Sequence, residues 1–384
     1  MPLNMCVKKY EPAGIYIHIP FCIRKCPYCD FYSVTDLSLQ DAFVRALKQE
    51  FFLNRQPDRV FDTVYLGGGT PSTLPPDAVG QLLESAHHAF CITKDAEITI
   101  EVNPGTVNEK KLTDLRSAGI NRLNIGVQSF QDENLKFLGR IHSAGDASRI
   151  IRQAREAGFE NIGLDLIYGL PDQSDVSWRS DLRRAMDIEP EHLSCYMLTY
   201  ESGTPLDQSR KQGLVHPLPE GRSAALFETT MEVADAGGYE HYEISNYARF
   251  PAARSRHNQK YWAFVPYLGF GPAAHSYMDA RRYWNHRNIS DYLSDLGRGK
   301  RPVGGEEQLN REQQIMETLY LGLRRTEGID IPSFDRNYGV RFNQLYEKVI
   351  TQLKELGCIE IDASRCRLTR KGMLFLDSIA AMLI

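Results

Sequence analysis

Residues 16–31 read YIHIPFCIRKCPYCDF, and this stretch decides how the rest of the chain is interpreted. It contains three cysteines at C-x3-C-x2-C spacing, namely Cys22, Cys26 and Cys29. An apolar, β-prone run precedes them, and Pro20 and Pro27 keep the intervening chain out of regular helix. The pattern therefore predicts a loop that leaves a strand and brings three thiolates onto one face.

Three thiolates on one loop can hold three irons of a cubane 4Fe-4S cluster. They leave the fourth iron open to a small molecule, because full thiolate ligation would need four cysteines. Three other interpretations stay open at this point. A structural zinc site would need a fourth ligand, which His18 could supply. A disulfide with a spare thiol is the second, and three unrelated buried cysteines are the third.

The bulk composition limits the class of protein. A length of 384 residues predicts one large domain and a smaller one. The formal net charge of −4 gives no strong basic field for nucleic acid. The other five of the eight cysteines follow no regular framework, and neither an apolar signal core nor a run of membrane-span length is present. These features predict a soluble cytoplasmic protein with no nucleic-acid partner.

Short β-prone runs alternate with amphipathic stretches from residue 14 to about residue 200. Gly119 and Gly158 follow two of these stretches and are expected to cap helices. Repeated β-α units predict an α/β fold with a parallel sheet, and six units predict a partial (β/α)6 barrel over residues 1–200. The expected strands are Gly14–His18, Asp62–Leu66, Glu97–Val102, Arg122–Gly126, Asn161–Ile167 and His192–Leu198.

Unusual polar residues follow these strands, at the edge where such barrels gather functional groups. The second strand runs into GGGTPS at residues 67–72, which is either a ligand-binding loop or a plain tight turn. Glu101 closes the third strand and either faces the mouth of the barrel or caps the next turn. Asp165 interrupts an apolar strand and needs a partner, because a buried unpaired carboxylate is costly. A ribose hydroxyl, Arg140 or a structural ion pair would serve.

The motifs GGGTPS, EVNP, GVQSF and DLIYGLP follow the cysteine motif in this order. As a set they resemble the oxygen-independent coproporphyrinogen III oxidase family of radical SAM proteins, from about residue 14 to the C-terminus. The resemblance implies that the three cysteines bind the cluster and that its open iron chelates S-adenosylmethionine. The positions that match the S-adenosylmethionine contacts of the family are Tyr16, Gly68, Gly69, Thr70, Glu101, Gln128, Arg140, Asp165 and Thr199.

The resemblance also suggests what the matched residues would do. Glycine N–H groups would receive the methionine moiety, and Glu101 would meet its ammonium group. Arg140 would meet its carboxylate, and Asp165 would accept from the ribose. An electron from the cluster would then cleave the sulfonium and give a 5′-deoxyadenosyl radical.

Two departures point to another branch of that family. The oxidases carry a fourth cysteine two residues after the third, where this chain has Phe31, and a long N-terminal extension before the barrel. The C-x3-C-x2-C-D-F pattern and the early start of the barrel resemble the haem-chaperone branch instead. A second motif of that branch, HNxxYW, is matched within RHNQKYW at residues 256–262.

The HNxxYW motif implies haem near one group of side chains, since histidine ligates iron and aromatic rings cover the macrocycle. Its members are His257, Asn258, Tyr261 and Trp262. A hydrogen-bonded structural histidine among core aromatic rings is the alternative for His257. The other candidate haem ligands are His275, His241 and His18. There is no C-x-x-C-H sequence for covalent c-type attachment.

The remainder of the chain divides into two further regions. Residues 201–305 are predicted to form a bridging or lid region against the barrel mouth, and it carries the HNxxYW motif. Residues 306–384 are predicted to form helices and a small hairpin that resemble a winged-helix domain. The charge bias of this domain is mild, which favours a closing or partner-docking role over DNA binding.

The resemblance implies a haem chaperone that carries a 4Fe-4S cluster and S-adenosylmethionine, binds haem as its cargo and passes it to apo-haemoproteins. Membrane-bound respiratory proteins are among the candidate acceptors, which would place the protein at the membrane periphery during delivery, and a homodimer is an open alternative. A coproporphyrinogen III dehydrogenase that decarboxylates two propionates is the second hypothesis. Another radical SAM enzyme is the third, so the sequence leaves enzymatic activity open.

Overall fold

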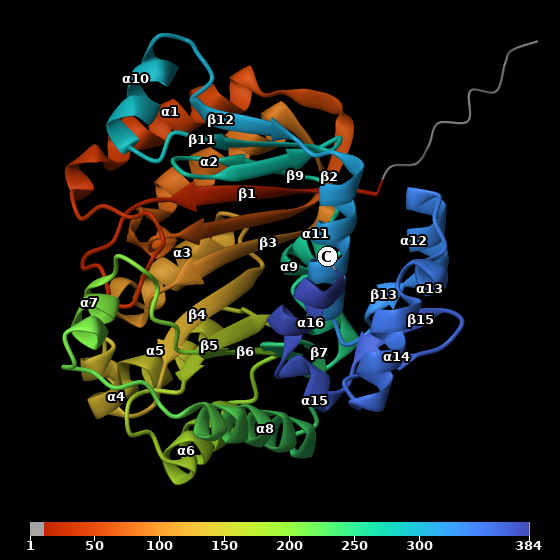
Figure 1. The fold of residues 1–384 in the computed structure, drawn as a ribbon. Helices are drawn as coiled ribbons and strands as arrows, with labels where there is room; N and C mark the ends of the chain where they lie inside the picture. The colour runs from red at the N-terminus through yellow and green to blue at the C-terminus, as the bar shows by residue number, and fades with distance from the viewer. Residues whose placement is uncertain (1–10, 384) are drawn as a thin grey trace, which may run out of the picture.

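The computed structural model describes residues 11–383, and one large sheet organises them (Figure 1). Six neighbouring strands run parallel and in chain order. They are β1 (Ala13–Ile19), β2 (Gln56–Gly68), β3 (Phe90–Val102), β4 (Arg122–Gln128), β5 (Ile162–Tyr168) and β6 (His192–Met197). All six predicted strands are therefore confirmed, and β2 and β3 begin earlier than expected because their first residues pair with each other.

Helices cover the outer face of this parallel part. They are α1 (Gln40–Leu53), α2 (Pro76–Ala89), α3 (Glu109–Ser117), α4 (Asp132–Phe137), α5 (Ala144–Glu156) and α6 (Asp175–Asp187). Alternating apolar residues of the strands, such as Ile15 and Ile17 of β1, are fully buried against them. Gly119 and Gly158 lie just beyond α3 and α5 with positive φ, as the C-cap prediction requires.

Much of the segment 201–305 extends the sheet at both ends. Strands β8 (Asn246–Ala248) and β7 (Glu240–Glu243) continue it beyond β6, and four strands continue it beyond β1. These four are β9 (Tyr267–Phe270), β10 (His275–Met278), β11 (Arg281–Asn285) and β12 (Val303–Gln308). The helices of this segment are α7 (Pro205–Lys211), α8 (Glu220–Ala236), α9 (Arg256–Trp262) and α10 (Ile289–Gly297). Where domain boundaries fall in this segment stays a prediction.

The C-terminal part forms its own apolar core around Leu319, Phe334 and Phe342. Its helices are α11 (Arg311–Arg324), α12 (Ile331–Tyr338), α13 (Phe342–Leu345), α14 (Glu347–Glu355), α15 (Arg370–Met373) and α16 (Leu376–Leu383). Strands β13 (Ile329–Asp330), β15 (Arg365–Leu368) and β14 (Ile359–Ile361) make a small antiparallel sheet. Helices with a hairpin agree with the predicted winged-helix-like character.

The apolar pattern of the C-terminal part predicts one helix over 342–356 and one from 369 to 384, and the structure splits each of them. The stretch 342–356 breaks at Tyr346, whose φ of −112° is not helical and whose ring packs on Phe342 at 5.1 Å between centroids. The final helix divides into α15 and α16, and residue 384 lies outside the described residues. Ring packing in the core, which the helical pattern does not encode, accounts for the first break.

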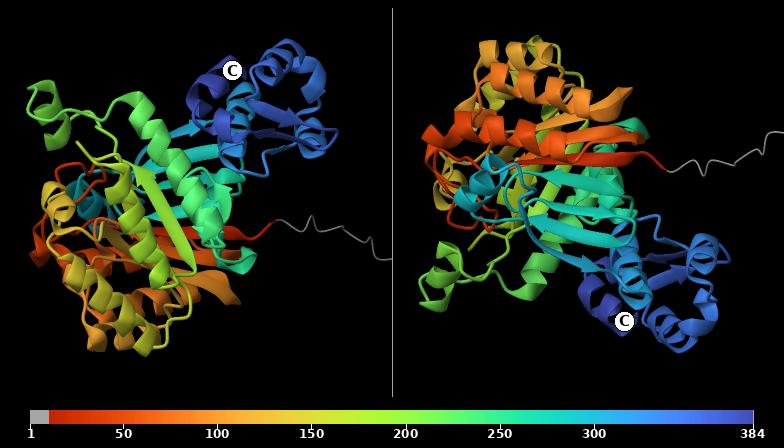
Figure 2. Two further views of the ribbon diagram at one scale, coloured as in Figure 1. Left: turned by 90° about the horizontal axis from the view of Figure 1, so that it is seen from below. Right: turned by 90° about the horizontal axis from the view of Figure 1, so that it is seen from above.

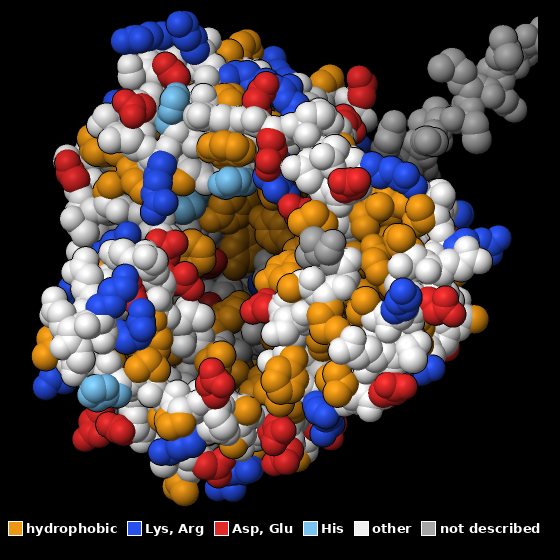
Figure 3. Space-filling view, viewed as in Figure 1, with side chains coloured by type: hydrophobic (Ala, Val, Ile, Leu, Met, Phe, Trp, Pro, Cys, Tyr) orange, Lys and Arg blue, Asp and Glu red, His pale blue; other side chains and the backbone are white. Residues whose placement is uncertain are grey.

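The inner face of the sheet borders a hollow. Figure 2 shows the C-terminal domain beside the sheet, and Figure 3 shows a hollow between the two, with hydrophobic side chains inside it and histidine side chains near its rim. The ion pairs Arg282–Glu317 at 2.7 Å and Arg324–Glu243 at 2.6 Å connect α11 to the large sheet. None of the helices between residues 11 and 383 combines the length and apolar character needed to cross a membrane.

Candidate functional site

The cysteine loop begins where β1 ends, at the C-terminal edge of the parallel strands. Phe21 is fully buried and anchors the loop, and Val34 ties its far end back through hydrogen bonds with Pro20 and Cys22 at 2.7 and 2.9 Å. The Cys22 thiol is buried, whereas the other two cysteines of the motif are partly exposed. All three are free thiols, so no disulfide joins any two of them. The predicted loop after a strand is confirmed.

His18 is not placed as a fourth zinc ligand, because both of its ring nitrogens are used. Nε2 donates to the Tyr32 carbonyl at 2.8 Å, so Nδ1 accepts from the Tyr16 hydroxyl at 3.1 Å. Burial lowers the pKa of His18 to about 4 and keeps the ring neutral. Within residues 11–383 no three His, Cys, Asp or Glu side chains converge as a site for a single metal ion.

The GGGTPS segment is both a tight turn and a close approach to Glu101. Gly68 has φ +112°, and a Cβ there would lie 2.6 Å from the His18 ring. Its N–H donates to Glu101 at 3.1 Å, and the Gly69 N–H donates to the Ile19 carbonyl at 2.9 Å. Both glycine N–H groups are therefore occupied by the protein itself. The expectation that they receive the methionine moiety does not match this arrangement.

Glu101 lies on the inner face of β3 at the mouth of the barrel. Besides the Gly68 N–H it accepts the Tyr65 hydroxyl at 2.9 Å. Burial, and next the nearby carboxylate of Asp165, raise the pKa of Glu101 to about 7. A cationic partner such as an ammonium group would restore the charged carboxylate.

Asp165 and Arg140 each present a buried atom without a partner. Asp165 Oδ2 accepts from Asn124 at 2.6 Å, while Oδ1 has no hydrogen bond of normal geometry within the described chain. Burial raises the pKa of Asp165 to about 6, although hydrogen bonding from the neighbouring Ser194 hydroxyl acts to lower it. Arg140 donates to the Gly126 carbonyl at 2.9 Å and to Cys26 Sγ at 3.6 Å, while its Nε is also left without a hydrogen bond. Other buried polar atoms of the described chain also have no hydrogen bond, but these two lie at the mouth among the residues matched by the resemblance, which makes them candidates for contact with a ligand.

The other predicted contact residues lie around the same mouth. Thr70 shares a hydrogen bond with the Cys22 thiol at 3.3 Å, which joins the glycine segment to the cysteine loop. Gln128 ends β4 with φ +68°, a strained conformation for a residue other than glycine. Thr199 follows β6 and is exposed. Tyr16 lies one strand from Tyr65 and stacks on it at 6.3 Å.

These residues fit the 4Fe-4S cluster and the S-adenosylmethionine that the resemblance implies. Three free thiols, a guanidinium against one of them, and two unpartnered buried atoms meet at one edge of the sheet. Tyr65 and Asn124 also contact this site, and the sequence analysis did not single them out. Tyr65 is the register neighbour of Tyr16, and Asn124 is the register neighbour of Glu101. Because neighbours in register point to the same face of a sheet, the alternation of the strands could have identified both.

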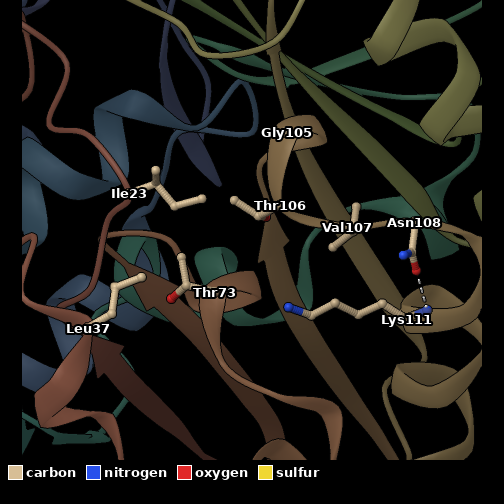
Figure 4. A pocket seen from close by; sticks show the side chains of 8 residues that line it. All are labelled: Ile23, Leu37, Thr73, Gly105, Thr106, Val107, Asn108 and Lys111. Carbon is tan, nitrogen blue, oxygen red and sulfur yellow. Dashed lines mark hydrogen bonds between the residues drawn. The ribbon is translucent and has the colours of Figure 1, made fainter.

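A surface pocket of about 340 Å³ lies beside the cysteine loop, not inside the barrel. Figure 4 shows Ile23 and Leu37 facing Thr106 and Lys111 across it. The Lys111 ammonium donates to the Ser72 carbonyl at 2.6 Å, and burial lowers its pKa. None of the residues predicted to contact S-adenosylmethionine lines this pocket.

The HNxxYW motif lies at the opposite end of the barrel from the cysteines. His257 hydrogen-bonds with Thr63 at 2.9 Å and with Tyr261 at 2.8 Å, so both ring nitrogens are engaged. It is 1% exposed, and burial is the main cause that lowers its pKa to about 3. The Gly14 end of β1 adjoins it, which puts roughly 17 Å of strand between His257 and the cysteine loop.

The rest of the motif also packs structurally. Trp262 contacts the Tyr242 ring at 5.8 Å, and the Asn258 N–H is held by Ser255 at the start of α9. This arrangement favours the alternative of a structural histidine over haem contact. Among the other histidines proposed for haem, His241 Nε2 donates to the Ile244 carbonyl at 3.1 Å, and its ring stacks on Tyr247. His275 is exposed on β10.

Comparisons with known proteins agree with this geometry. The model of the Radical SAM superfamily matches residues 16–185, and the model of the HemN C-terminal domain matches residues 309–375. The solved structure of coproporphyrinogen III oxidase HemN from Escherichia coli superposes with a TM-score of 0.84 over 97% of this chain and 90% of that one, at 24% identity. The fold and the site therefore define a radical SAM protein of the HemN-like architecture.

More similar relatives narrow this class. The heme chaperone HemW of Bacillus subtilis is 35% identical over 94% of this chain and 96% of that protein. HemW of Escherichia coli is 41% identical over 70% of each chain, and a mitochondrial radical S-adenosyl methionine domain-containing protein 1 of Bos taurus is 30% identical over 97% of this chain and 88% of that protein. The chain belongs to the HemW family.

Proposed function

We propose that this protein is a haem chaperone that carries a 4Fe-4S cluster and S-adenosylmethionine at the barrel mouth, binds haem and transfers it to apo-haemoproteins. The printed names of the relatives support the haem part, since they call those proteins heme chaperones. The three free thiols beside Arg140 support the cluster. Cytoplasmic location, with peripheral membrane contact during delivery, belongs to the same proposal.

The observation that carries the cofactor part is the set of unsatisfied groups at the mouth. The guanidinium of Arg140 would neutralise thiolate charge at Cys26 and offer its free Nε to a carboxylate. Glu101 would receive an ammonium group, and the free oxygen of Asp165 a ribose hydroxyl. When bound, the cluster and S-adenosylmethionine supply one-electron cleavage of a sulfonium bond. Whether this protein uses that cleavage is part of the test.

Phe31 separates this proposal from a coproporphyrinogen III dehydrogenase. It stands where the oxidases carry their fourth cysteine, and its side chain is 67% exposed. The cysteine loop itself offers only the three thiols of the motif. A site that lacks the fourth thiol is the feature that favours haem handling over porphyrinogen decarboxylation.

The experiment uses anaerobically reconstituted full-length protein in two parallel assays. One arm receives haem, followed by an apo-haemoprotein acceptor. The other receives coproporphyrinogen III with S-adenosylmethionine and a reductant. We expect stoichiometric haem binding and transfer to the acceptor, and no protoporphyrinogen. Conversion of the porphyrinogen would overturn the chaperone proposal and favour the dehydrogenase, while activity in neither arm would point to another radical SAM reaction.

A further inference from the structure

A row of rings crosses the inner face of the sheet at the middle of β1 and β2, where Tyr16 and Tyr65 also stack on His257. Tyr65 and Tyr16 are register neighbours on β2 and β1, and Tyr16 is the register neighbour of Gly269 on β9. The β9–β10 register, fixed by the pair Tyr277–Tyr267, places His275 beside Gly269, and Trp284 of β11 pairs with His275. Neighbours in register point to the same face of a sheet.

Two stacked pairs make up this row, with a glycine between them. The rings of His275 and Trp284 lie 5.5 Å apart at 28°, and those of Tyr16 and Tyr65 lie 6.3 Å apart at 28°. A Cβ at Gly269 would come within 2.0 Å of the His275 carbonyl oxygen. Only glycine fits there, so the row has a gap between the imidazole and the Tyr16 ring.

His275 differs from the other candidate haem histidines because its ring is free. No hydrogen bond to its nitrogens is found within residues 11–383, whereas His18, His241 and His257 all use ring nitrogens in hydrogen bonds. Its side chain is exposed. Burial of the ring's surroundings, and next the positive charge of Arg282, lower its pKa, so the imidazole is neutral at pH 7 and keeps a lone pair available.

Aromatic and charged side chains surround His275 on the sheet. Two residues along β11 from Trp284, Arg282 pairs with Glu317 of α11 and so brings that helix opposite the row. Hydrophobic side chains are visible within the hollow (Figure 3). Such a space suits a flat apolar macrocycle.

We propose that His275, held in orientation by the Trp284 ring, is the axial ligand through which this protein holds the iron of haem. This assignment rests on the proposed haem-binding function and locates it at this row of rings instead of at the HNxxYW motif. The neutral imidazole donates its lone pair to the iron and displaces a water molecule, and no electron or proton is transferred. The gap at Gly269 leaves the iron-facing edge of the ring unobstructed.

The test titrates haem into anaerobic full-length protein and into His275→Ala. The wild type should give a Soret band and an electron paramagnetic resonance signal of histidine-ligated iron. His275→Ala should lose that signature and bind haem at least about tenfold more weakly. Added imidazole should restore the spectrum, and His275→Cys should give a thiolate-ligated one. The matched control is His87→Ala, because His87 is also exposed but lies on α2 outside the barrel.

Each outcome separates this assignment from the proposed function. If the wild type gives no haem spectrum, the chaperone proposal fails and the ligand assignment fails with it. If the wild type binds haem and His275→Ala has the same spectrum and affinity, the assignment alone is overturned. Loss of binding without rescue by imidazole and without a thiolate spectrum in His275→Cys, in variants with native circular dichroism, would mean that His275 only packs, and would overturn it too.

Discussion

The two ends of the barrel differ in how their candidate ligand residues are hydrogen-bonded, although the end opposite the mouth also contains buried polar atoms without a hydrogen bond within the described residues, such as Nε and Nη1 of Arg122. At the mouth, Asp165 Oδ1 and Arg140 Nε are buried and have no hydrogen bond within the described residues. At the opposite end, both nitrogens of His257 are bound, and Glu97 accepts the N–H groups of Arg256 and His257 at 3.2 and 3.1 Å.

Glu97 and Glu101 lie four residues apart on the inner face of β3, and the carboxylate of Asp165 contributes, after burial, to the raised pKa of Glu101. A polar group whose partners are all protein atoms stabilises the fold, whereas an unsatisfied one is available to a ligand. A family motif can therefore mark residues that pack one end of the barrel as easily as residues that bind a ligand.

The largest expected effect of breaking the mouth is loss of the cluster. The triple variant with Cys22, Cys26 and Cys29 each changed to Ser should lack the charge-transfer absorbance of the reconstituted protein entirely, because serine hydroxyls do not replace thiolates on iron. Iron and sulfide analysis checks the result. The control is Cys91→Ser, since Cys91 is a free and exposed thiol elsewhere in the fold. A cluster retained by the triple variant would refute the ligand assignment.

The next effect tests the opposite end. His257→Ala should lower the free energy of unfolding by about 2–4 kcal/mol, because it leaves Thr63 and Tyr261 without a partner and opens a cavity under Tyr65. Chemical denaturation of the cofactor-free protein measures this, with His87→Ala as the control.

Haem affinity in folded His257→Ala should stay close to that of the wild type. A variant with native stability and lost haem binding would reverse the comparison and return the haem site to the HNxxYW motif.

The sequence predicted the parallel strands well and the position of the HNxxYW motif poorly, for physical reasons. The apolar alternation of β1 to β6 and the glycine caps of α3 and α5 are local signals, and all six strands were found. Strand β9 has only four residues, and its pairing with β1 depends on residues far apart in the chain. The HNxxYW motif around His257 is also a local sequence signal. Its position at one end of the barrel, however, is decided by how the strands before and after it pair in the sheet.

The contribution of the mouth to stability should also depend on pH. The folded-state pKa of Glu101 is raised to about 7 from its ordinary value of 4.5, chiefly by burial. Between these two values the unfolded chain has lost the proton and the folded one retains it. Stability should therefore fall as pH rises from 4.5 to 7, by up to about 3 kcal/mol from this group.

Glu101→Gln should remove that part of the decline. Urea unfolding of cofactor-free protein at pH 5 and pH 8 measures it. Glu109→Gln removes a carboxylate from the exposed start of α3 and controls for net charge. An unchanged difference between the two pH values would show that Glu101 is already charged in the folded protein, and that the mouth does not hold its carboxylates apart from solvent.

The smallest expected effect concerns Phe31, the residue that distinguishes this mouth from that of the oxidases. Phe31→Ser should change stability by less than about 0.5 kcal/mol, because the ring is 67% exposed. The cluster should be retained, since the residue offers no ligand to iron. An exposed aromatic ring next to the cysteine loop is, however, well placed to contact an acceptor protein. Unchanged haem binding with slower transfer to the acceptor would thus show that Phe31 contacts the acceptor protein. Unchanged transfer would show that the Phe31 ring has no role of its own, and that the position differs from the oxidases only in lacking their fourth thiol.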